Sequence, residues 1–562
     1  MTGRAMTTHW DESYDVVVVG SGAAGMAAAI TAGLRGLSVL IVEKTESYGG
    51  SSALSGGAIW APGNFHLTAA GLGDTREQAR AYLDATVGDR VSGDRKDAYL
   101  THGPRMVREF HDRTEVRFVY TPGYSDYFPE QPGGLPQGRS TEPEIFDFNR
   151  LTPEQRATMR RAGLPTYGLT ITSFDFRFLN MVGRTWAGRR TSVKVGLRAV
   201  GALLTRRKLL SLGEALIARM RLTLAQQGGE LWLNAPVSEL LEEDGRVVGV
   251  RVTRNGRETA VRARGGVVLA AGGFSHSQQL REKYLPGPTS TAWSSAAEGQ
   301  TGDLLTEGMR LGAAVDLLDK VWGAPSVVPP DRKPFFLVAD RGIPGMVIVN
   351  QAGERYANEA APYHAFVNAM YANDRDGAGT VPSWLILDAR SKSRYLFLGL
   401  FPGQPFPRRW LDSGFVKKAA TLAELAARTG MDPTRLAATV ERFNGFARAG
   451  RDEDFHRGDS VYDRYYGDPT LANPNLDQLG KAPFYAIPVH PGDIGTKGGL
   501  LTDADGRVLR EGGDPVPGLY ASGNVSAAVM GETYPGPGAT LGPAMVFSYL
   551  AVESIARATA AG

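Results

Sequence analysis

The chain has 562 residues, with 62 Lys and Arg against 59 Asp and Glu, 70 glycines and no cysteine. The length exceeds that of one ordinary domain, and a net charge of only +3 does not give the basic field that nucleic-acid binding requires. The lack of cysteine excludes disulfides, thiolate-bound iron–sulfur clusters and cysteine nucleophiles, so redox chemistry would need a bound organic cofactor. We expect no nucleic-acid partner and no metal site.

A strand–helix–strand pattern opens the chain. Residues 14–20 are an apolar run typical of a buried parallel strand, an alanine-rich helical stretch follows, and a second apolar run ends in Glu43. Gly20 permits a tight turn, Gly22 lets the backbone approach a pyrophosphate, and Gly25 lets helix and strand pack closely. The helix N-terminus offers N–H groups to phosphates, and Glu43 can accept hydrogen bonds from a ribose. The pattern predicts a dinucleotide site.

Further elements of the same kind return later in the chain. The segment GGSSALSGG at 49–57 could lay backbone N–H groups and hydroxyls against a second part of the cofactor, although read alone it is a flexible loop as often as a binding loop. Asp244-Gly245 marks a hairpin between apolar runs, and a later apolar strand ends in Gly272. Near the C-terminus, GLYASGN ends in Asn524, and a helix-like tail runs from Ala544.

This order predicts an α/β fold with a discontinuous domain. A Rossmann-like cofactor domain would comprise residues 1–275 and 490–562, with a basic helical insertion near 150–212. Residues 276–489 would form an inserted α+β catalytic domain.

Three further segments carry a resemblance to a known family. They are GYSDYFPE at 123–130, NEAAPY at 358–363 and TYPGPGAT at 533–540. With the features above, they resemble the 3-ketosteroid Δ1-dehydrogenases, a group within the FAD-dependent fumarate reductase/succinate dehydrogenase flavoprotein superfamily. The resemblance covers nearly the whole chain and implies FAD, bound noncovalently, because GGSSALSGG has no histidine of the kind to which succinate dehydrogenases attach flavin. The predicted FAD-binding residues are Gly20, Gly22, Ala23, Ala24, Gly25, Glu43, Lys44, Gly50, Ser51, Ser52, Ser55, Gly57, Val237, Ala271, Gly272, Gly302, Asp303, Gly523, Asn524, Gly538 and Leu541.

The resemblance also implies a reaction and its catalytic residues. Steroid ring A degradation would begin with loss of a proton from C2 and a hydride from C1, beside the C3 ketone. Tyr534 and Gly538 would polarise the ketone, Tyr363 would be the base, and Tyr127 would be its hydrogen-bonding partner. An unperturbed tyrosine has a pKa near 10, so a phenolate base needs a donor beside it. Each position has a structural alternative: YPGPG alone is also a rigid turn, tyrosines mostly pack, and Tyr124 could be confused with Tyr127.

Two positions bear on an alternative function, in which the substrate would be a dicarboxylate as in fumarate reductases. Arg341 and His490 lie near the substrate-binding arginine and histidine of fumarate reductases, but TYPGPGATLGP stands where a second arginine would be expected. One arginine and one histidine are too few for a dianion, so both are interpreted as surface or structural residues and the substrate as neutral. The alternatives are a Δ4-(5α)-dehydrogenase, another enoate- or fumarate-type oxidoreductase, or a flavin electron-transfer protein. Three matching tyrosines argue against the last. A quinone is expected to reoxidise the flavin.

The stretch 184–212 combines basic residues with an apolar stripe and contains no acid. Such a helix could lie on an anionic membrane surface, but a solvated helix face is the alternative. No apolar leader or membrane-spanning window is present, which predicts a cytoplasmic protein, with membrane association open. The basic residues are Arg184, Arg189, Arg190, Lys194, Arg198, Arg206, Arg207 and Lys208.

Overall fold

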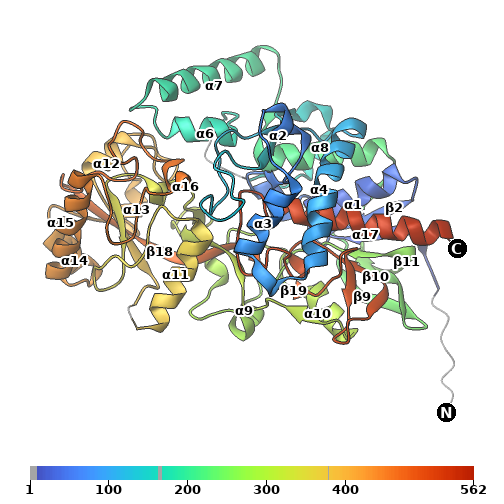
Figure 1. Ribbon diagram of the computed structural model, residues 1–562. Coiled ribbons are helices and arrows are strands. Elements are labelled where there is room, and N and C mark those ends of the chain that lie inside the picture. The colour runs from blue at the N-terminus through green and yellow to red at the C-terminus, as the bar shows by residue number, and fades with distance from the viewer. Residues whose placement is uncertain (1–8, 163–167, 378, 562) are drawn as a thin grey trace.

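The computed structural model describes residues 9–162, 168–377 and 379–561 (Figure 1). One part of the molecule holds the elements near both termini, and a second part holds the middle of the chain, drawn in yellow to brown. Helix α7 (Trp186–Leu204) runs along the top of this view, beyond both parts.

An eight-stranded mixed sheet forms the centre of the first part. Its path has the order β20-β21-β11-β1-β2-β8, and the pairs β21/β11, β11/β1, β1/β2 and β2/β8 are all parallel. The β9–β10 hairpin adds to β11, and both it and β20 pair antiparallel. The strands are β1 (Glu12–Val19), β2 (Val39–Val42), β8 (Glu230–Trp232), β9 (Val237–Glu243), β10 (Arg246–Arg254), β11 (Arg257–Leu269), β20 (Arg507–Leu509) and β21 (Pro515–Ala521).

The alternation of side chains along β1 explains how the sheet is covered. Val16 and Val18 are fully buried in one core cluster with residues of α1 (Ala23–Leu34), α8 (Leu212–Gln226) and α17 (Leu541–Ala561). Val17 and Val19 point to the opposite face, into a cluster with the β9–β10 hairpin and α10 (Asp303–Arg310). Burial on both faces accounts for the continuous apolar run of this strand.

A second, antiparallel sheet forms the centre of the other part. Its order is β14-β13-β18-β16-β15, with β17 also paired to β18. Helix α11 (Tyr363–Arg375) packs on β13, while α14 (Leu422–Thr429) and α15 (Pro433–Ala449) pack together beyond β17. The strands are β13 (Val321–Val327), β14 (Phe335–Phe336), β15 (Met346–Val349), β16 (Ser383–Asp388), β17 (Lys417–Ala419) and β18 (Phe484–Thr496).

The described residues also form small sheets and further helices, and none of their helices is long and apolar enough to span a bilayer. The small sheets consist of β3 (Ile59–Trp60), β5 (Ser140–Pro143) and β4 (Phe118–Tyr120), of β6 (Phe146–Asp147) and β7 (Leu209–Leu210), and of β12 (Val315–Asp316) and β19 (Gly499–Leu500). The remaining α-helices are α2 (Phe65–Ala69), α3 (Arg76–Thr86), α4 (Gly93–Arg113), α5 (Pro153–Ala157), α6 (Ser173–Leu179), α9 (Gln278–Tyr284), α12 (Ala389–Arg394), α13 (Arg408–Asp412) and α16 (Val461–Arg464).

The predicted α/β class and the predicted hairpin are confirmed. Asp244 and Gly245 both have positive φ, 49° and 74°, as a tight hairpin turn requires. The C-terminal helix starts at Leu541, three residues before the predicted Ala544, and the glycine-rich loop contains a 3-10 turn, η1 (Gly50–Leu54). Strand β18 crosses residue 490, so the predicted boundary there falls inside an intact strand.

Candidate functional site

Three glycines lie at the turn between β1 and α1. A side chain would clash with the backbone at two of them but not at the third. Gly20 has φ +106° and its Cβ would lie 2.4 Å from the Ala270 carbonyl oxygen, while a Cβ at Gly25 would lie 1.9 Å from the Gly20 carbonyl oxygen. Gly22 has an ordinary φ of −68°, and its Cβ would meet Ser52 Oγ at an unstrained 3.5 Å. The protein therefore leaves room beside Gly22, which fits the pyrophosphate of a dinucleotide at the N-terminus of α1.

Glu43 lies at the end of β2 against this turn. Its Oε2 accepts hydrogen bonds from Ser21 N (3.1 Å) and Ser21 Oγ (2.6 Å), and its Oε1 from Thr45 N (3.0 Å) and Thr45 Oγ1 (2.9 Å). These four donors occupy the acceptor sites of the carboxylate. Because the hydroxyls can rotate, ribose hydroxyls could replace them while both backbone donors stay in place.

The loop after Glu43 packs onto the same helix terminus. Ser52 Oγ accepts from Ala23 N at 3.0 Å, the first residue of α1, and Ser51 Oγ accepts from Ala297 N at 2.7 Å. Gly50 faces Gly22, since a Cβ on it would lie 3.6 Å from the Gly22 Cα. The serines thus connect the N-terminus of α1 to a distant segment around residue 297.

Two of the predicted FAD-binding residues in this loop stabilise the conformation of the loop. Ser55 Oγ donates to the Ser52 carbonyl at 2.8 Å. Gly57 has φ +70°, and a Cβ there would lie 2.6 Å from the Leu212 carbonyl carbon. A hydrogen bond within the loop accounts for Ser55, and close packing accounts for Gly57.

Several predicted residues lie on segments that surround this helix terminus. Lys44 Nζ forms an ion pair with Asp303 Oδ2 at 2.7 Å, next to Gly302, the N-cap of α10 with φ +82°. A Cβ on Gly523 would lie 3.4 Å from the Ala24 Cβ, so the C-terminal part of the chain contacts α1 directly.

The other predicted cofactor residues fall at element ends. Gly272 (φ +75°) follows β11 and Ala271, and Gln300 lies against it. Val237 begins β9, two residues after Ala235, whose N–H donates to the Glu43 carbonyl at 2.9 Å. Asn524 Oδ1 accepts from Trp322 Nε1 at 3.1 Å, and Leu541 begins α17.

Three buried tyrosines from distant segments meet at a second location. Tyr127, Tyr363 and Tyr534 are 2%, 5% and 3% exposed. The Tyr127 hydroxyl donates to the Tyr363 hydroxyl at 2.7 Å. The ring centroids lie 5.4 Å apart for Tyr127 and Tyr363, 5.0 Å for Tyr127 and Tyr534, and 5.3 Å for Tyr363 and Tyr534. We call these three residues the tyrosine triad.

Backbone carbonyls of the proline-containing loop fix two members of the triad relative to each other. Tyr127 N donates to the Pro535 carbonyl at 2.9 Å, and Tyr82 Oη donates to the same carbonyl at 2.6 Å. Ser140 Oγ donates to the Pro537 carbonyl at 2.6 Å. Tyr127 and Tyr534 are therefore held by hydrogen bonds that do not depend on their own side chains.

Helix α11 positions the third member. Tyr363 is its first residue, at the helix end where a negative charge is stabilised. The next residue, His364, has its Nε2 2.8 Å from the Glu532 carbonyl, and its Nδ1 accepts from Gly323 N at 3.2 Å. Burial lowers the pKa of His364 to about 3, so the ring is neutral and donates through Nε2. This contact ties α11 to the loop that carries Tyr534.

Burial and hydrogen bonding have opposite effects on the pKa values of the tyrosine triad. Burial raises the pKa of each of the three phenols. The hydrogen bond from Tyr127 acts in the opposite direction on Tyr363, lowering its pKa. Tyr363, Thr540 and the Gly538 backbone likewise lower the pKa of Tyr534. In the free protein the phenols are neutral near pH 7, and the Tyr363 hydroxyl accepts the hydrogen bond from Tyr127.

The backbone conformation at position 538 requires a glycine. It has φ +89°, and a Cβ there would lie 2.5 Å from the Ala58 carbonyl oxygen. Its backbone reaches the Tyr534 hydroxyl. The Gly538 backbone therefore lies next to the Tyr534 hydroxyl, and an N–H and an O–H side by side can stabilise a developing oxyanion.

Several residues near the triad were not among the predicted site residues. The Tyr462 ring lies 4.9 Å from Tyr127, and Tyr465 stacks on Tyr124 at 4.5 Å. Buried Lys497 donates to the Thr533 carbonyl. We call Tyr124, Tyr462 and Tyr465 the aromatic wall. The tyrosine-rich run VYDRYYGD at 461–468 is the sequence signal that could have indicated it.

Of the two residues weighed against a dicarboxylate site, Arg341 is buried and His490 is half-buried. The Arg341 guanidinium donates to the carbonyls of Leu337 (3.2 Å) and Glu359 (2.5 Å) and so supports the segment that leads to Tyr363. The His490 ring stacks on Trp293 at 4.8 Å, and burial lowers its pKa to about 4. A neutral imidazole and a guanidinium already bonded to backbone are not suited to bind a dianion.

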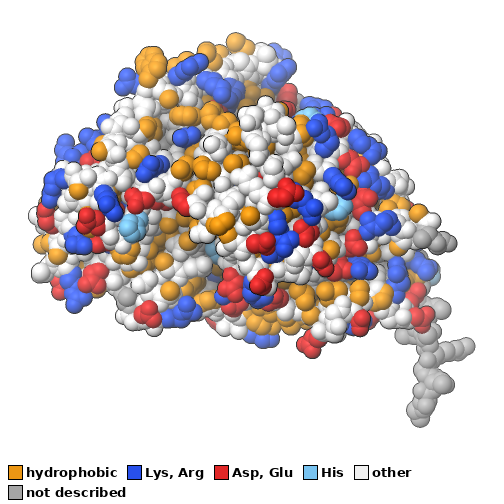
Figure 2. Space-filling view, viewed as in Figure 1, with side chains coloured by type: hydrophobic (Ala, Val, Ile, Leu, Met, Phe, Trp, Pro, Cys, Tyr) orange, Lys and Arg blue, Asp and Glu red, His pale blue; other side chains and the backbone are white. Residues whose placement is uncertain are grey.

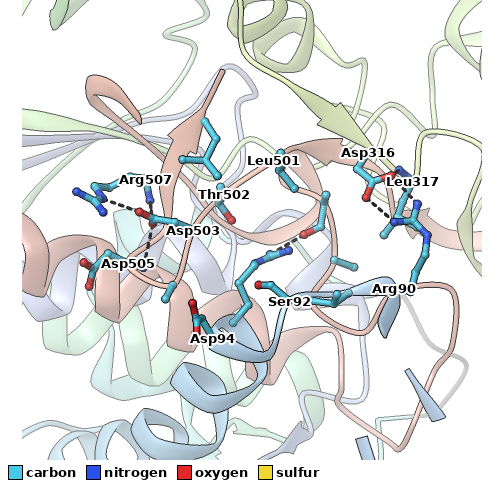
Figure 3. Close-up of a pocket in the computed structure, with 16 residues that line it drawn as sticks. Arg90, Ser92, Asp94, Asp316, Leu317, Leu501, Thr502, Asp503, Asp505 and Arg507 are labelled. Atoms are coloured by element: carbon cyan, nitrogen blue, oxygen red, sulfur yellow. Dashed lines mark hydrogen bonds and ion pairs between the residues drawn. The ribbon is translucent and has the colours of Figure 1, made fainter. Parts of the chain in front are cut away.

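A cavity of about 420 Å³ lies elsewhere in the molecule (Figure 3). Its lining contains none of the predicted site residues. In Figure 3, Arg90 points to Asp316 and Arg507 to Asp503, and each pair forms an ion pair at 2.6 Å. A lining of this charge does not suit an apolar ligand.

Comparison with known proteins gives a full-length match. The FAD binding domain family model matches residues 15–541. The chain is 46% identical to a 3-oxosteroid 1-dehydrogenase of Mycolicibacterium smegmatis over 98% of both chains, and 47% identical to one of Mycobacterium tuberculosis over 97% of this chain and 98% of the relative. The crystal structure of 3-ketosteroid Δ1-dehydrogenase from Sterolibacterium denitrificans, in complex with 1,4-androstadiene-3,17-dione, superposes with a TM-score of 0.94 at 41% identity, covering 97% of this chain and 100% of that one.

Proposed function

The chain belongs to the 3-oxosteroid 1-dehydrogenases, a group of FAD-binding oxidoreductases, and we propose how its own residues remove the hydrogens at C1 and C2 of a 3-ketosteroid. FAD, when bound, supplies the acceptor for the C1 hydride. The hydrogen on C2 is acidified by the neighbouring ketone and leaves as a proton. The protein must polarise that ketone, accept the proton and orient ring A.

Tyr534 and Gly538 polarise the C3 ketone. The phenol O–H and the backbone N–H both donate to the ketone oxygen, on which negative charge develops as C2 loses its proton. The support for this role is the proximity of the Gly538 backbone to the Tyr534 hydroxyl, together with the hydrogen bonds to the backbone carbonyls of their loop.

Tyr363 accepts the C2 proton, and Tyr127 assists it. The observation that carries this assignment is the 2.7 Å hydrogen bond from Tyr127 to Tyr363. Burial raises the pKa of Tyr363, so the phenolate needs the Tyr127 donor and the N-terminal end of α11 to become accessible near neutral pH.

The cofactor binds noncovalently at the N-terminus of α1, beside Gly22, Glu43 and Ser52. The supporting observations are the space beside Gly22 and the lack of a histidine in residues 49–57. Acid precipitation should release all of the flavin into the supernatant, and yellow colour that stays in the pellet would contradict this mode. A quinone reoxidises the flavin, so a soluble quinone, and not NAD⁺, should sustain turnover.

The direct test is an anaerobic titration of the yellow holoenzyme with a Δ4-3-ketosteroid. Bleaching of the flavin absorbance, with formation of the 1,4-diene-3-one, is the expected result. A matched steroid with a 3-hydroxyl group should leave the spectrum unchanged, because it has no ketone to acidify C2. Bleaching by succinate but not by the ketosteroid would overturn the proposal.

A further inference from the structure

One lysine lies in the interior of the molecule, beside the tyrosine triad. Figure 2 shows Lys and Arg side chains spread over the visible face, where a charge is hydrated. Lys497, by contrast, is 0% exposed, and its amino group forms no ion pair with an acid among the residues described. Burial lowers the pKa of Lys497, but the amino group keeps N–H donors in either protonation state. A lysine is almost never fully buried without an acidic partner, so the position of this one needs an explanation.

The amino group of Lys497 has two contacts, and both lead to Tyr534. Its Nζ donates a hydrogen bond to the carbonyl of Thr533, the residue before Tyr534. The same atom lies over the ring of Trp322, 4.2 Å from the centroid. The Trp322 ring in turn packs edge-on against the Tyr534 ring, with centroids 4.8 Å apart. Lys497 therefore acts on Tyr534 both through the main chain before it and through the ring beside it.

The main chain of Lys497 is itself held in place. Its N–H donates to the Lys320 carbonyl at 3.0 Å, and its carbonyl accepts from Ala528 N at 3.2 Å. The next residue, Gly498, packs so closely that a Cβ on it would lie 2.2 Å from the Leu317 carbonyl oxygen. The amino group is therefore presented to the Thr533 carbonyl from a fixed segment between β18 and β19.

Two consecutive carbonyls before Tyr534 are held by side chains from different elements. The Glu532 carbonyl lies 2.8 Å from His364 Nε2, on the helix that begins with the proposed base. The Thr533 carbonyl accepts from Lys497. The carbonyls of the two prolines after Tyr534 are held in the same way by the groups described above. Tyr534 thus lies between fixed stretches of main chain, and Lys497 holds the carbonyl immediately before it.

We propose that Lys497 is a positioning residue for the polarisation of the C3 ketone: through the Thr533 carbonyl and the Trp322 ring it fixes the direction in which the Tyr534 hydroxyl points. This inference rests on the role proposed above for Tyr534. A phenol stabilises the charge that develops on the ketone oxygen only when its O–H is aimed at that atom. A misplacement of about 1 Å can cost on the order of 10²-fold in rate. A methionine at position 497 would fill a similar space but would leave the Thr533 carbonyl without its donor.

The test is a double-mutant cycle on the holoenzyme, comparing the wild type, Lys497→Met, Tyr534→Phe and the double variant. The measured quantity is the rate of anaerobic flavin bleaching by a Δ4-3-ketosteroid. Lys497→Met should slow bleaching at saturating steroid by at least about ten-fold. The half-saturating steroid concentration should change by less than about three-fold, because the lost interaction strengthens only as charge develops. In the Tyr534→Phe background the same substitution should slow bleaching by less than about three-fold, because the hydroxyl through which Lys497 acts is gone.

Lys392 provides a matched control. It is 5% exposed, its Nζ donates to the Gln404 carbonyl at 2.8 Å, and that atom lies 5.3 Å from the centroid of the Phe406 ring. Lys392→Met therefore removes the same kind of contact at a distance from the triad, and it should bleach like its parent in both backgrounds. The flavin-to-protein ratio shows that each variant is folded.

The possible outcomes separate this inference from the one on which it rests. Should Lys497→Met fail to retain flavin, the cycle is repeated with Lys497→Gln, whose shorter side chain also releases the Thr533 carbonyl. Equal slowing in both backgrounds is the result expected of a merely structural lysine, and it would overturn the inference, as would wild-type bleaching by Lys497→Met. Wild-type bleaching by Tyr534→Phe would instead refute the role of Tyr534 and with it the basis of the inference.

Discussion

Tyr127→Phe would isolate the hydrogen bond on which the proposed base depends. The substitution removes the hydroxyl that donates to Tyr363 at 2.7 Å and keeps the ring, which packs against Tyr363, Tyr462 and Tyr534. A hydrogen bond to a charged acceptor contributes about 1.5–3 kcal/mol. At 1.36 kcal/mol per pKa unit, its loss should raise the pKa of Tyr363 by about 1–2 units.

The kinetic consequence follows from the phenolate population. With the pKa of Tyr363 above the assay pH, each unit of increase lowers the phenolate fraction about ten-fold, so kcat near pH 7 should fall roughly 10- to 150-fold. The rising limb of the pH profile should move to higher pH by the same 1–2 units. Steroid-dependent dye reduction at saturating steroid, measured from pH 6 to pH 10, would report both effects.

Tyr465→Phe is the matched control. Tyr465 is 3% exposed and belongs to the same aromatic wall, but its hydroxyl has no hydrogen-bond partner among the described atoms. Its removal should leave kcat within about two-fold, because no hydrogen bond is lost. If Tyr127→Phe behaves like Tyr465→Phe, with the pH profile in place, the donor role of Tyr127 is refuted.

The remaining predictions concern the base, the cofactor turn and pH. Tyr363→Phe should retain FAD but lose about 10²- to 10⁴-fold in kcat; full activity would remove Tyr363 as the base. Gly22→Ala should fold and lose FAD affinity, whereas Gly25→Ala, whose Cβ would lie 1.9 Å from a backbone oxygen, should fail to fold stably; equal flavin content in folded Gly22→Ala would contradict the assignment. Glu43→Ala should weaken FAD retention during dialysis, and an unchanged flavin-to-protein ratio would contradict a ribose contact. In the wild type, kcat/KM should rise from pH 7 to pH 9 by up to about ten-fold per unit, since a base whose pKa is raised gains phenolate as pH rises; a falling profile would exclude a phenolate base.

The cofactor turn could be predicted from local sequence because its signals lie within one short unit. Gly20, Gly25 and Glu43 are each explained by contacts with the turn or the strand beside it. The triad was different, because nothing in the spacing of Tyr127, Tyr363 and Tyr534 indicates that they meet. Only the resemblance to a family connected them.

Other features could not be predicted because they depend on contacts between distant segments. A count of charges along 184–212 cannot show that Arg184 and Arg198 are neutralised by Asp468 and Asp175. Likewise, the sequence does not reveal that the Tyr462 ring lies 4.9 Å from Tyr127. The division of the chain into domains stays a prediction, and β18 shows that its boundary near 490 is not at an element end.

The prolines at 535 and 537 give this site a property that matters for engineering. Their carbonyls, and not their rings, hold Tyr127, Tyr82 and Ser140. These backbone acceptors remain when a side chain is replaced. The main chain therefore sets the position of Tyr127 relative to the loop that carries Tyr534. The aromatic wall can therefore be redesigned for bulkier or smaller ring systems while the spacing of the proton-transfer groups is retained.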